Sequence, residues 1–222
     1  MEKHLVKIVD IIPVTHDVRS YVVEKPKGYR FIPGQATEVS VNKEGWEDEK
    51  RPFTFTSLND WNHLQFTIKS YPDHDGVTKQ IGLLQPGDEL YIRDVWGAIA
   101  YKGEGYFIAG GAGITPFIAI LRQLHSDGAI GNNQLFFSNK TVDDIILHNE
   151  LDQMLGTNAH YILSAEEAAG YEHGRIDKAY LLNHIKNFKK PFYICGPDKM
   201  IQDITAILKD LGADPDTVVF EK

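Results

Sequence analysis

Cysteine is nearly absent from this chain, because Cys195 is the single one among 222 residues. One cysteine cannot form a disulfide within the chain. It also excludes a cysteine-based zinc site and an iron–sulfur cluster held by four cysteines of this chain. Any iron–sulfur centre that works with this protein must therefore belong to another protein.

Long hydrophobic runs are also missing. No stretch approaches the roughly 18 consecutive apolar residues that a membrane-spanning helix needs. The N-terminal sequence MEKHLVKIVD lacks the apolar core of a secretory signal. We therefore expect a cytoplasmic protein with no membrane span.

Positive charge is in deficit, with 23 Lys and Arg against 31 Asp and Glu and a formal net charge of −8. Because phosphate backbones are bound through clustered Lys and Arg, we expect no nucleic-acid partner. An acidic protein partner would need a local basic patch. The sequence contains no internal repeat or low-complexity run, and it carries no signal for an oligomeric state.

Histidine is more frequent, but its spacing does not suggest a metal site. The chain has nine histidines, and none forms a His-x-x-x-His or comparable ligand pair. They are His4, His16, His63, His74, His125, His148, His160, His173 and His184. We therefore expect no bound metal.

The first half of the chain has a strand-like pattern. Short apolar or alternating segments, separated by turns rich in Pro, Gly, Asn and Asp, predict an antiparallel β-barrel or sandwich. The predicted strands lie at 5–9, 20–23, 36–41, 53–56, 64–69 and 90–92, with one short helix at 77–84.

The pattern changes after residue 102, where short apolar strands alternate with segments of helical length. The predicted strands lie at 106–109, 134–137, 160–163 and 192–195, with a further edge strand at 217–220. The predicted helices lie at 116–126, 147–155, 177–187 and 197–211. This alternation is typical of a parallel α/β sheet. The sequence thus predicts a β domain over residues 1–102 and an α/β domain over residues 103–222.

A glycine-rich segment follows the first strand of the second half. Gly110, Gly111 and Gly113 precede Thr115 and Pro116, which open a predicted helix. Backbone amides at a helix N-terminus attract a pyrophosphate, and glycine allows the close approach that this requires. Tight packing of the helix on the sheet is the alternative explanation. Pro116 also stands where the Rossmann fingerprint has its third glycine.

Three motifs in this order resemble those of the ferredoxin–NADP reductase superfamily. They are Arg51-Pro52-Phe53-Thr54, the glycine segment that follows it, and Cys195-Gly196-Pro197 after the last apolar strand of the α/β half. The resemblance covers nearly the whole chain. It implies an antiparallel β-barrel that binds FAD, followed by a parallel-sheet α/β domain that binds NAD(P).

By this resemblance, the first motif holds the flavin. Arg51 would pair with the flavin pyrophosphate through its planar donor fork. Phe53 would pack on the isoalloxazine ring and the ribityl chain, with Pro52 beside it, and the Thr54 hydroxyl would lie near flavin N5. Many members have Tyr at the position of Phe53, so this chain lacks one hydroxyl hydrogen bond there.

Two further segments of the first half resemble the flavin diphosphate site. Ile68-Lys69-Ser70 would belong to the strand that lines the diphosphate, and Gly76-Val77-Thr78 to the helix start that caps it. A helix N-terminus with Thr78 offers free amides and one hydroxyl to an anion.

The second half would hold the nicotinamide dinucleotide. Gly110, Gly111, Gly113 and Thr115 correspond to its pyrophosphate loop, and Cys195-Gly196-Pro197 to the segment that flanks the nicotinamide ring. A lone cysteine at a strand end is usually a small packing residue. With Thr54, Cys195 is nevertheless our candidate for a catalytic position, where it would shape the hydride path.

The resemblance implies an FAD-dependent NAD(P)H oxidoreductase. Hydride would pass from NADH or NADPH to flavin N5, and electrons would pass on to a carrier such as flavodoxin, ferredoxin or a haem protein. FAD is the usual cofactor of the family, although the motifs do not separate it from FMN. Relatives that use NADPH often carry arginine in the segment corresponding to 164–167, where this chain has Ser-Ala-Glu-Glu. This favours NADH, but Lys140 could still meet a 2′-phosphate.

Three alternatives stay open. The chain could reduce small acceptors such as free flavins, ferric chelates or quinones, because docking at an exposed flavin edge needs no motif. It could be an electron-transfer subunit of a larger complex, although such subunits of dihydroorotate dehydrogenase use four cysteines that this chain lacks. It could also be a nucleotide-binding module that has lost its flavin, against which Arg51, Thr54 and Thr78 stand. We expect a module with no attached ferredoxin domain.

Overall fold

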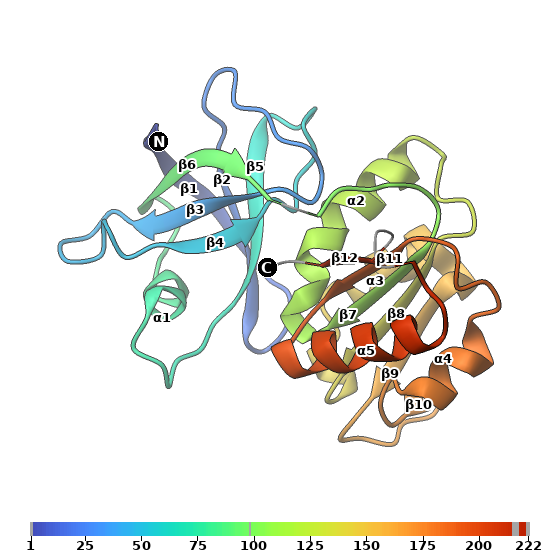
Figure 1. Ribbon diagram of the computed structural model, residues 1–222. Helices are drawn as coiled ribbons and strands as arrows, with labels where there is room; N and C mark the ends of the chain where they lie inside the picture. The colour runs from blue at the N-terminus through green and yellow to red at the C-terminus, as the bar shows by residue number, and fades with distance from the viewer. Residues whose placement is uncertain (1, 98, 215–217, 221–222) are drawn as a thin grey trace.

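The computed structural model describes residues 2–97, 99–214 and 218–220. Figure 1 shows two halves side by side. The N-terminal half consists of strands and one short helix, and the C-terminal half is a sheet flanked by helices. No helix in these residues is both long and apolar enough to cross a membrane.

The N-terminal half is an antiparallel β-sheet that curls into a barrel. Its strands are β1 (His4–Pro13), β2 (Val18–Glu24), β3 (Ala36–Val41), β4 (Arg51–Thr54), β5 (His63–Lys69) and β6 (Glu89–Trp96), in the order β4-β3-β6-β1-β2-β5. Just after β4, the Thr56 amide donates to the Gln65 carbonyl of β5 at 2.8 Å, which links the two outer strands. The short helix α1 (Val77–Gly82) lies between β5 and β6.

The C-terminal half is a six-stranded parallel sheet. Its strands are β7 (Tyr106–Gly110), β8 (Gln134–Asn139), β9 (Ala159–Leu163), β10 (Glu172–His173), β11 (Phe192–Cys195) and β12 (Val218–Phe220), in the order β10-β9-β8-β7-β11-β12. The helices are α2 (Thr115–Ser126), α3 (His148–Leu155), α4 (Lys178–His184) and α5 (Asp198–Asp210). Short 3₁₀ turns occupy Gly111–Ile114, Val142–Asp144 and Gly156–Asn158.

Both faces of this sheet are covered, because successive side chains of a strand point to opposite faces. Phe107, Phe137 and Tyr193 pack in one apolar cluster with α2 and α3. Their neighbours Phe136 and Ile194 pack in another cluster with α4 and α5. This explains why the strands appear in the sequence as continuous apolar runs.

The strand order reverses at β7. From β7 the chain adds β8 and β9 on one side, and then returns to place β11 on the other side of β7. The loops that leave β7 and β11 therefore diverge at the carboxyl ends of two neighbouring strands. In open α/β sheets a crevice forms at such a point, and ligands bind there.

The predicted fold class, an antiparallel barrel followed by a parallel α/β sheet, is confirmed. Element ends differ from prediction by a few residues. The predicted helix at 177–187 begins only at Lys178, because Asp177 is its N-cap and accepts from the Tyr180 amide at 2.8 Å. The two-residue strand β10 was not predicted. The predicted edge strand at 217–220 corresponds to β12, with residue 217 and the Phe220 side chain outside the described part.

Candidate functional site

The glycine segment makes the turn from β7 into α2. It forms the 3₁₀ turn Gly111–Ile114, so α2 itself begins at Thr115, and the Thr115 hydroxyl donates to the Ala112 carbonyl at 3.0 Å. The helix was predicted to begin at Pro116, which the structure confirms within one residue. The 3₁₀ turn stands between the strand and the helix.

Each glycine meets a different constraint. A Cβ atom on Gly113 would lie 2.3 Å from the Cys195 carbonyl oxygen, so the loops after β7 and β11 touch backbone to backbone. A Cβ atom on Gly110 would lie 2.5 Å from the Met200 sulfur. Gly111 has φ +52°, and nothing lies within 4 Å of the position of its Cβ, which leaves its backbone open to a ligand. The segment therefore packs on one side and is free on the other.

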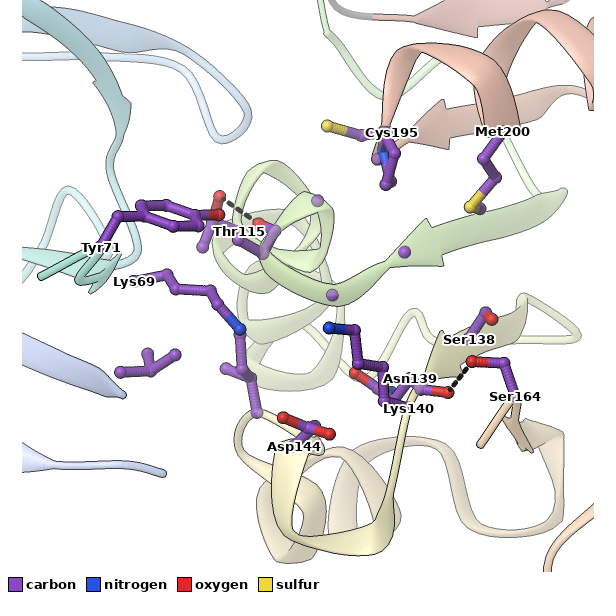
Figure 2. Close-up of a pocket in the computed structure, with 18 residues that line it drawn as sticks. Lys69, Tyr71, Thr115, Ser138, Asn139, Lys140, Asp144, Ser164, Cys195 and Met200 are labelled. Atoms are coloured by element: carbon purple, nitrogen blue, oxygen red, sulfur yellow. Dashed lines mark hydrogen bonds between the residues drawn. The ribbon is translucent and has the colours of Figure 1, made fainter. Parts of the chain in front are cut away.

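A cavity of about 710 Å³ opens at this point, between the two halves of the molecule (Figure 2). It is lined by the loops after β7, β8, β9 and β11, and by the end of β5 from the barrel. Eight of the predicted site residues line it: Lys69, Gly110, Gly111, Gly113, Thr115, Cys195, Gly196 and Pro197.

Asn139, at the end of β8, is an unusual member of the lining. It is only 5% exposed, and within the part of the chain that is described neither its Nδ2 nor its Oδ1 atom has a hydrogen-bond partner. A buried amide without partners costs about 1–3 kcal/mol. Both atoms are buried, so a polar ligand in the cavity would supply the missing partners only if the side chain rotates toward it.

Two lysines and one aspartate, Asp144, line the cavity, so its charged side chains are of both signs. Figure 2 shows the amino groups of Lys69 and Lys140 turned toward the space between them, one from the barrel and one from the α/β half. The Lys69 amino group lies 2.7 Å from an Asp17 carboxylate oxygen, which neutralises part of its charge. Burial alone would raise the pKa of Asp17, but the hydrogen bond and the charge of Lys69 hold it below its ordinary value.

The predicted flavin residues lie on the barrel, and apart from Lys69 they do not line this cavity. On β4, Arg51 and Pro52 are exposed, Phe53 is half-buried and Thr54 is 6% exposed. The Arg51 guanidinium donates to the Lys50 carbonyl at 2.7 Å, and its outward face is accessible to an anion.

The second predicted flavin segment joins β5 to α1. Ile68 is buried at the end of β5, and the half-buried Ser70 directs its hydroxyl to the Thr78 carbonyl at 3.5 Å. Gly76 is the N-cap of α1, with no side-chain cap and open space at its Cβ position. The first-turn amides of Val77 and Thr78 have no partner within the helix. Together with Arg51, these donors suit a diphosphate.

The barrel and the α/β half are joined by Arg122 of α2, which sequence reasoning missed. Its side chain is 10% exposed and makes a two-point ion pair with Glu150, at 2.5 and 2.8 Å. Its remaining donor group reaches the Thr56 carbonyl at 2.6 Å and the Gln65 side-chain oxygen at 2.7 Å, both in the barrel. A lone arginine within the apolar pattern of 116–126 was the only sequence signal for this contact.

Other cavity residues also escaped the sequence. Asp144 lines the cavity from the 3₁₀ turn after β8, and it caps that turn by accepting from the amide and hydroxyl of Thr141 at 3.0 and 2.7 Å. Met200 lies under Gly110. Neither Asp144 nor Met200 belongs to a motif, because each arrives there through the packing of distant segments. Tyr71, which directly follows the predicted segment Ile68-Lys69-Ser70, also reaches the cavity from the barrel.

Known proteins share both the sequence pattern and the fold. A family model of the oxidoreductase NAD-binding domain matches residues 107–206. The chain is 28% identical to NADH-cytochrome b5 reductase 2 of Mycosarcoma maydis, over 88% of this chain and 62% of that protein. It is 26% identical to the reductase component of propane 2-monooxygenase of Rhodococcus jostii (strain RHA1), over 97% of this chain and 62% of that protein. The chain thus spans about three fifths of the length of these curated relatives.

The fold likeness extends over the whole chain. The crystal structure of a ferredoxin NADP+ reductase from Neisseria gonorrhoeae, with bound FAD and NADP, matches with a TM-score of 0.84. The match covers 100% of this chain and 98% of that chain, at 17% identity. Both halves of the molecule and their arrangement are therefore those of a known two-domain fold.

Proposed function

We propose that the chain is a member of the ferredoxin–NADP reductase superfamily, and that it is an FAD-dependent NAD(P)H oxidoreductase that passes electrons to a separate acceptor. The observation that carries this proposal is the cavity at the strand-order reversal, lined by the glycine segment and by Cys195-Gly196-Pro197. We also propose the division into a flavin domain, residues 1–102, and a nucleotide domain, residues 103–222.

The nucleotide domain would bind the hydride donor in the cavity. The open backbone at Gly111 and the amides of the 3₁₀ turn would hold the donor pyrophosphate, with Gly110, Gly113 and Thr115 shaping the loop. The unpartnered Asn139 amide would bind a polar group of the nucleotide after rotating its side chain into the cavity. Gly196 and Pro197 would flank the nicotinamide ring.

The barrel would bind the flavin. Arg51 would pair with the diphosphate, assisted by Lys69, Ser70 and the start of α1 at Gly76-Val77-Thr78. Phe53, with Pro52 and Ile68 near it, would provide the packing surface for the ring. These assignments rest on the donor set, which suits an anion, and on the resemblance of the motifs.

When bound, flavin accepts a hydride at N5 and can release the electrons singly. The residues of this chain would contribute alignment and exclusion of water, which matter more here than acid–base chemistry. Thr54 is buried at the end of β4, where its hydroxyl would hydrogen-bond the reacting edge of the ring. Cys195, 7% exposed at the end of β11, would shape the hydride path from the other domain.

We propose NADH as the donor. The segment after β9 carries Glu166, whose carboxylate accepts from the Val142 amide at 2.8 Å and so stands near the end of β8 as a fixed negative charge. A 2′-phosphate would be repelled there, although Lys140 in the cavity would attract it. The name of the Mycosarcoma maydis relative also specifies NADH.

The acceptor is proposed to be a small redox protein such as a flavodoxin, a ferredoxin or a haem protein. The names of the two relatives, a cytochrome b5 reductase and a monooxygenase reductase component, support a protein acceptor. The second candidate is a reductase of free flavin, ferric chelates or quinones, and the third is a subunit of a larger complex. We propose the cytoplasm as its location, where the proposed donor is available.

The first test is a visible spectrum of the purified protein, followed by anaerobic addition of NADH and NADPH in separate samples. We expect the flavin band near about 450 nm to bleach rapidly with NADH and more slowly with NADPH. A protein that takes up no FAD and oxidises neither nucleotide would contradict the proposal. Steady-state rates with cytochrome b5, a ferredoxin and ferricyanide then separate a protein acceptor from small ones.

The role of Arg51 has its own test, FAD affinity measured by quenching of flavin fluorescence. We expect Arg51→Ala to weaken FAD binding at least about tenfold, since a charge-assisted contact contributes about 1.5–3 kcal/mol. Arg175→Ala removes an exposed arginine of the other domain and should leave the affinity unchanged. Equal affinities of the two variants would refute the assignment.

A further inference from the structure

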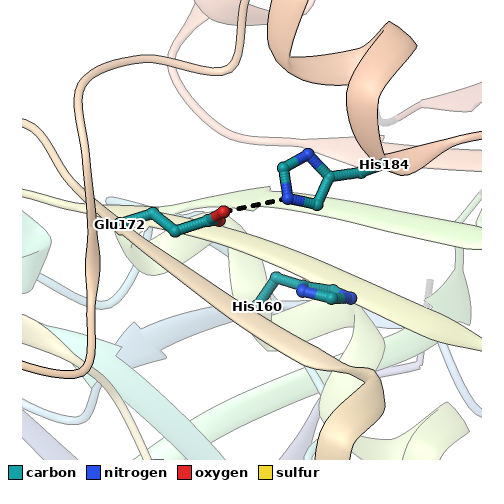
Figure 3. Close-up of side chains that lie close together, drawn as sticks. All are labelled: His160, Glu172 and His184. Carbon is teal, nitrogen blue, oxygen red and sulfur yellow. Dashed lines mark hydrogen bonds and ion pairs between the residues drawn. The ribbon is translucent and has the colours of Figure 1, made fainter.

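A second group of polar side chains lies on the α/β domain, away from the cavity. His160 of β9, Glu172 of β10 and His184 of α4 place one potential ligand atom each within 4.8 Å of the other two (Figure 3). The three residues are well separated in the sequence, so their spacing gave no sign of the cluster. Only the parallel pairing of β10 with β9, and the packing of α4 beside them, brings them together.

The hydrogen bonds of His184 determine where its proton lies. Its Nδ1 atom is 2.9 Å from the Tyr180 carbonyl oxygen, which can only accept, so Nδ1 carries a hydrogen. The Nε2 atom faces a Glu172 oxygen at 2.9 Å. In the neutral imidazole, Nε2 then presents a lone pair to the carboxylate, and a cation between them would satisfy both groups. In the imidazolium, Nε2 would instead donate to Glu172 directly. Metal-binding histidines commonly donate their other nitrogen to a backbone carbonyl in this way.

Glu172 and His160 are also oriented. The Tyr180 hydroxyl donates to the second oxygen of Glu172, which leaves the first oxygen for a cation. The His160 ring stacks on Phe136, with ring centres 4.8 Å apart, and this fixes its plane. A neutral His160 offers one nitrogen lone pair to a cation.

We propose that His160, Glu172 and His184 bind a zinc ion, with water in the fourth position. Two imidazole nitrogens and one carboxylate oxygen are a donor set that zinc takes in proteins. Zinc at about 2.0–2.1 Å from each ligand sets the ligand atoms about 3.3 Å apart. Since the observed atoms lie within 4.8 Å, no pair has to close by more than about 1.5 Å, which side-chain rotation can supply.

The site would act on structure and not on the proposed hydride transfer. His160 is near the start of β9, whereas the cavity is reached at Ser164, about 13 Å further along an extended strand. The ion would join α4 to the outer edge of the sheet, where β10 has only two residues. It would hold in place a strand that backbone pairing alone supports weakly.

Zinc binding can be measured on the full chain with FAD added, after metal removal by a chelator and dialysis. Titration in competition with a chromophoric zinc chelator should give one tightly bound zinc per chain. We expect His184→Gln and Glu172→Gln each to weaken zinc binding at least about tenfold. Loss of a residue that only supports a ligand typically weakens metal binding about 10–100-fold, and loss of a ligand itself should cost at least as much. X-ray absorption of the zinc-loaded protein should show only nitrogen and oxygen ligands.

The matched control is His16→Gln. Among the residues that the structure describes, His16, Asp17 and Asp144 are the second group whose ligand atoms lie together, so this variant tests the competing site. It should bind zinc like the wild type. Glu172 is exposed, so Glu172→Gln should fold even where His184→Gln does not, and circular dichroism without zinc checks this. If the wild type binds no stoichiometric zinc, or if His16→Gln alone loses it, the proposal is wrong, and His184 and Glu172 form only an ion pair.

Discussion

Gly113→Ala is the substitution that most directly tests how the glycine segment is built. The added Cβ atom would lie 2.3 Å from the Cys195 carbonyl oxygen, 2.5 Å from its carbon and 2.6 Å from the Gly196 Cα atom. All three neighbours are backbone atoms, so no side chain can rotate away. Reaching an ordinary contact of 3.4 Å requires the two loops to separate by about 1 Å.

The expected cost follows from this displacement. Overpacking a well-packed region costs about 1–3 kcal/mol. A clash with backbone atoms, which cannot rotate away, belongs at the upper end of this range. For a chain of this size, about 3 kcal/mol lowers Tm by roughly 6–12 °C. Because the same loops line the cavity, the separation should also weaken binding of the nicotinamide nucleotide.

Gly111→Ala is the matched control, two residues away in the same turn. Nothing lies within 4 Å of its Cβ position, so its cost is only the left-handed backbone at φ +52°, about 1–2 kcal/mol. Thermal unfolding of both variants and the wild type, at equal FAD and protein concentrations, should rank Gly113→Ala clearly lowest. If Gly113→Ala melts with the wild type, or above Gly111→Ala, the close contact between the two loops is not real.

Three further substitutions test the contact between the two domains and the cavity. Arg122→Ala should lower the free energy of unfolding, measured in urea, by about 2–4 kcal/mol, because it leaves a part-buried Glu150 and two barrel acceptors unpaired. Arg122→Lys should recover only part of this free energy. Full recovery would show that the two-point geometry of the arginine is unimportant. Lys140→Ala should lower kcat/KM for NADPH about tenfold and leave that for NADH nearly unchanged, in steady-state assays; equal losses would exclude a 2′-phosphate contact. The stabilisation by Asp17 is the difference in free energy of unfolding between the wild type and Asp17→Asn, measured across a pH series. It should be complete above the ordinary pKa of 3.8 and disappear as pH falls through the lowered pKa of Asp17. A difference that instead grows in acid would reverse the inferred sign.

The sequence predicted the strands well where burial is continuous. The four inner strands of the parallel sheet appear as short apolar runs because both of their faces are covered, and each was found within about two residues. Long-range pairing set the ends that prediction missed. Strand β6 was predicted as 90–92 but continues to Trp96, since Ala36 of β3 pairs with Trp96 after a shift in register.

In the candidate site, too, the residues of local motifs were predicted, and residues brought in by long-range packing were missed. Motifs identified the glycine segment and Cys195-Gly196-Pro197, because a backbone that approaches a ligand needs glycine wherever it occurs. Residues such as Asp144 and Met200 carry no motif, and only the packing of separate segments brings them to the cavity. His160 and His184 are a stronger case, since two histidines with no local pattern become neighbours only when α4 packs beside β9.

The contact between the two domains matters for the proposed function as much as the motifs do. In the proposed function, the flavin ring lies on the barrel and the nicotinamide ring on the α/β domain, so their alignment depends on how the domains are fixed. Two of the contacts that fix them involve single residues. Arg122 binds acceptors on the barrel. Gly34, at φ +96°, approaches so closely that its Cβ would lie 2.4 Å from the Ile99 carbonyl oxygen and 3.1 Å from Ile120 of α2. A misplacement of about 1 Å can reduce a rate about 100-fold. Changes at Gly34 or Arg122 should therefore slow flavin reduction by NADH while leaving FAD affinity largely intact, whereas changes at Arg51 should do the reverse.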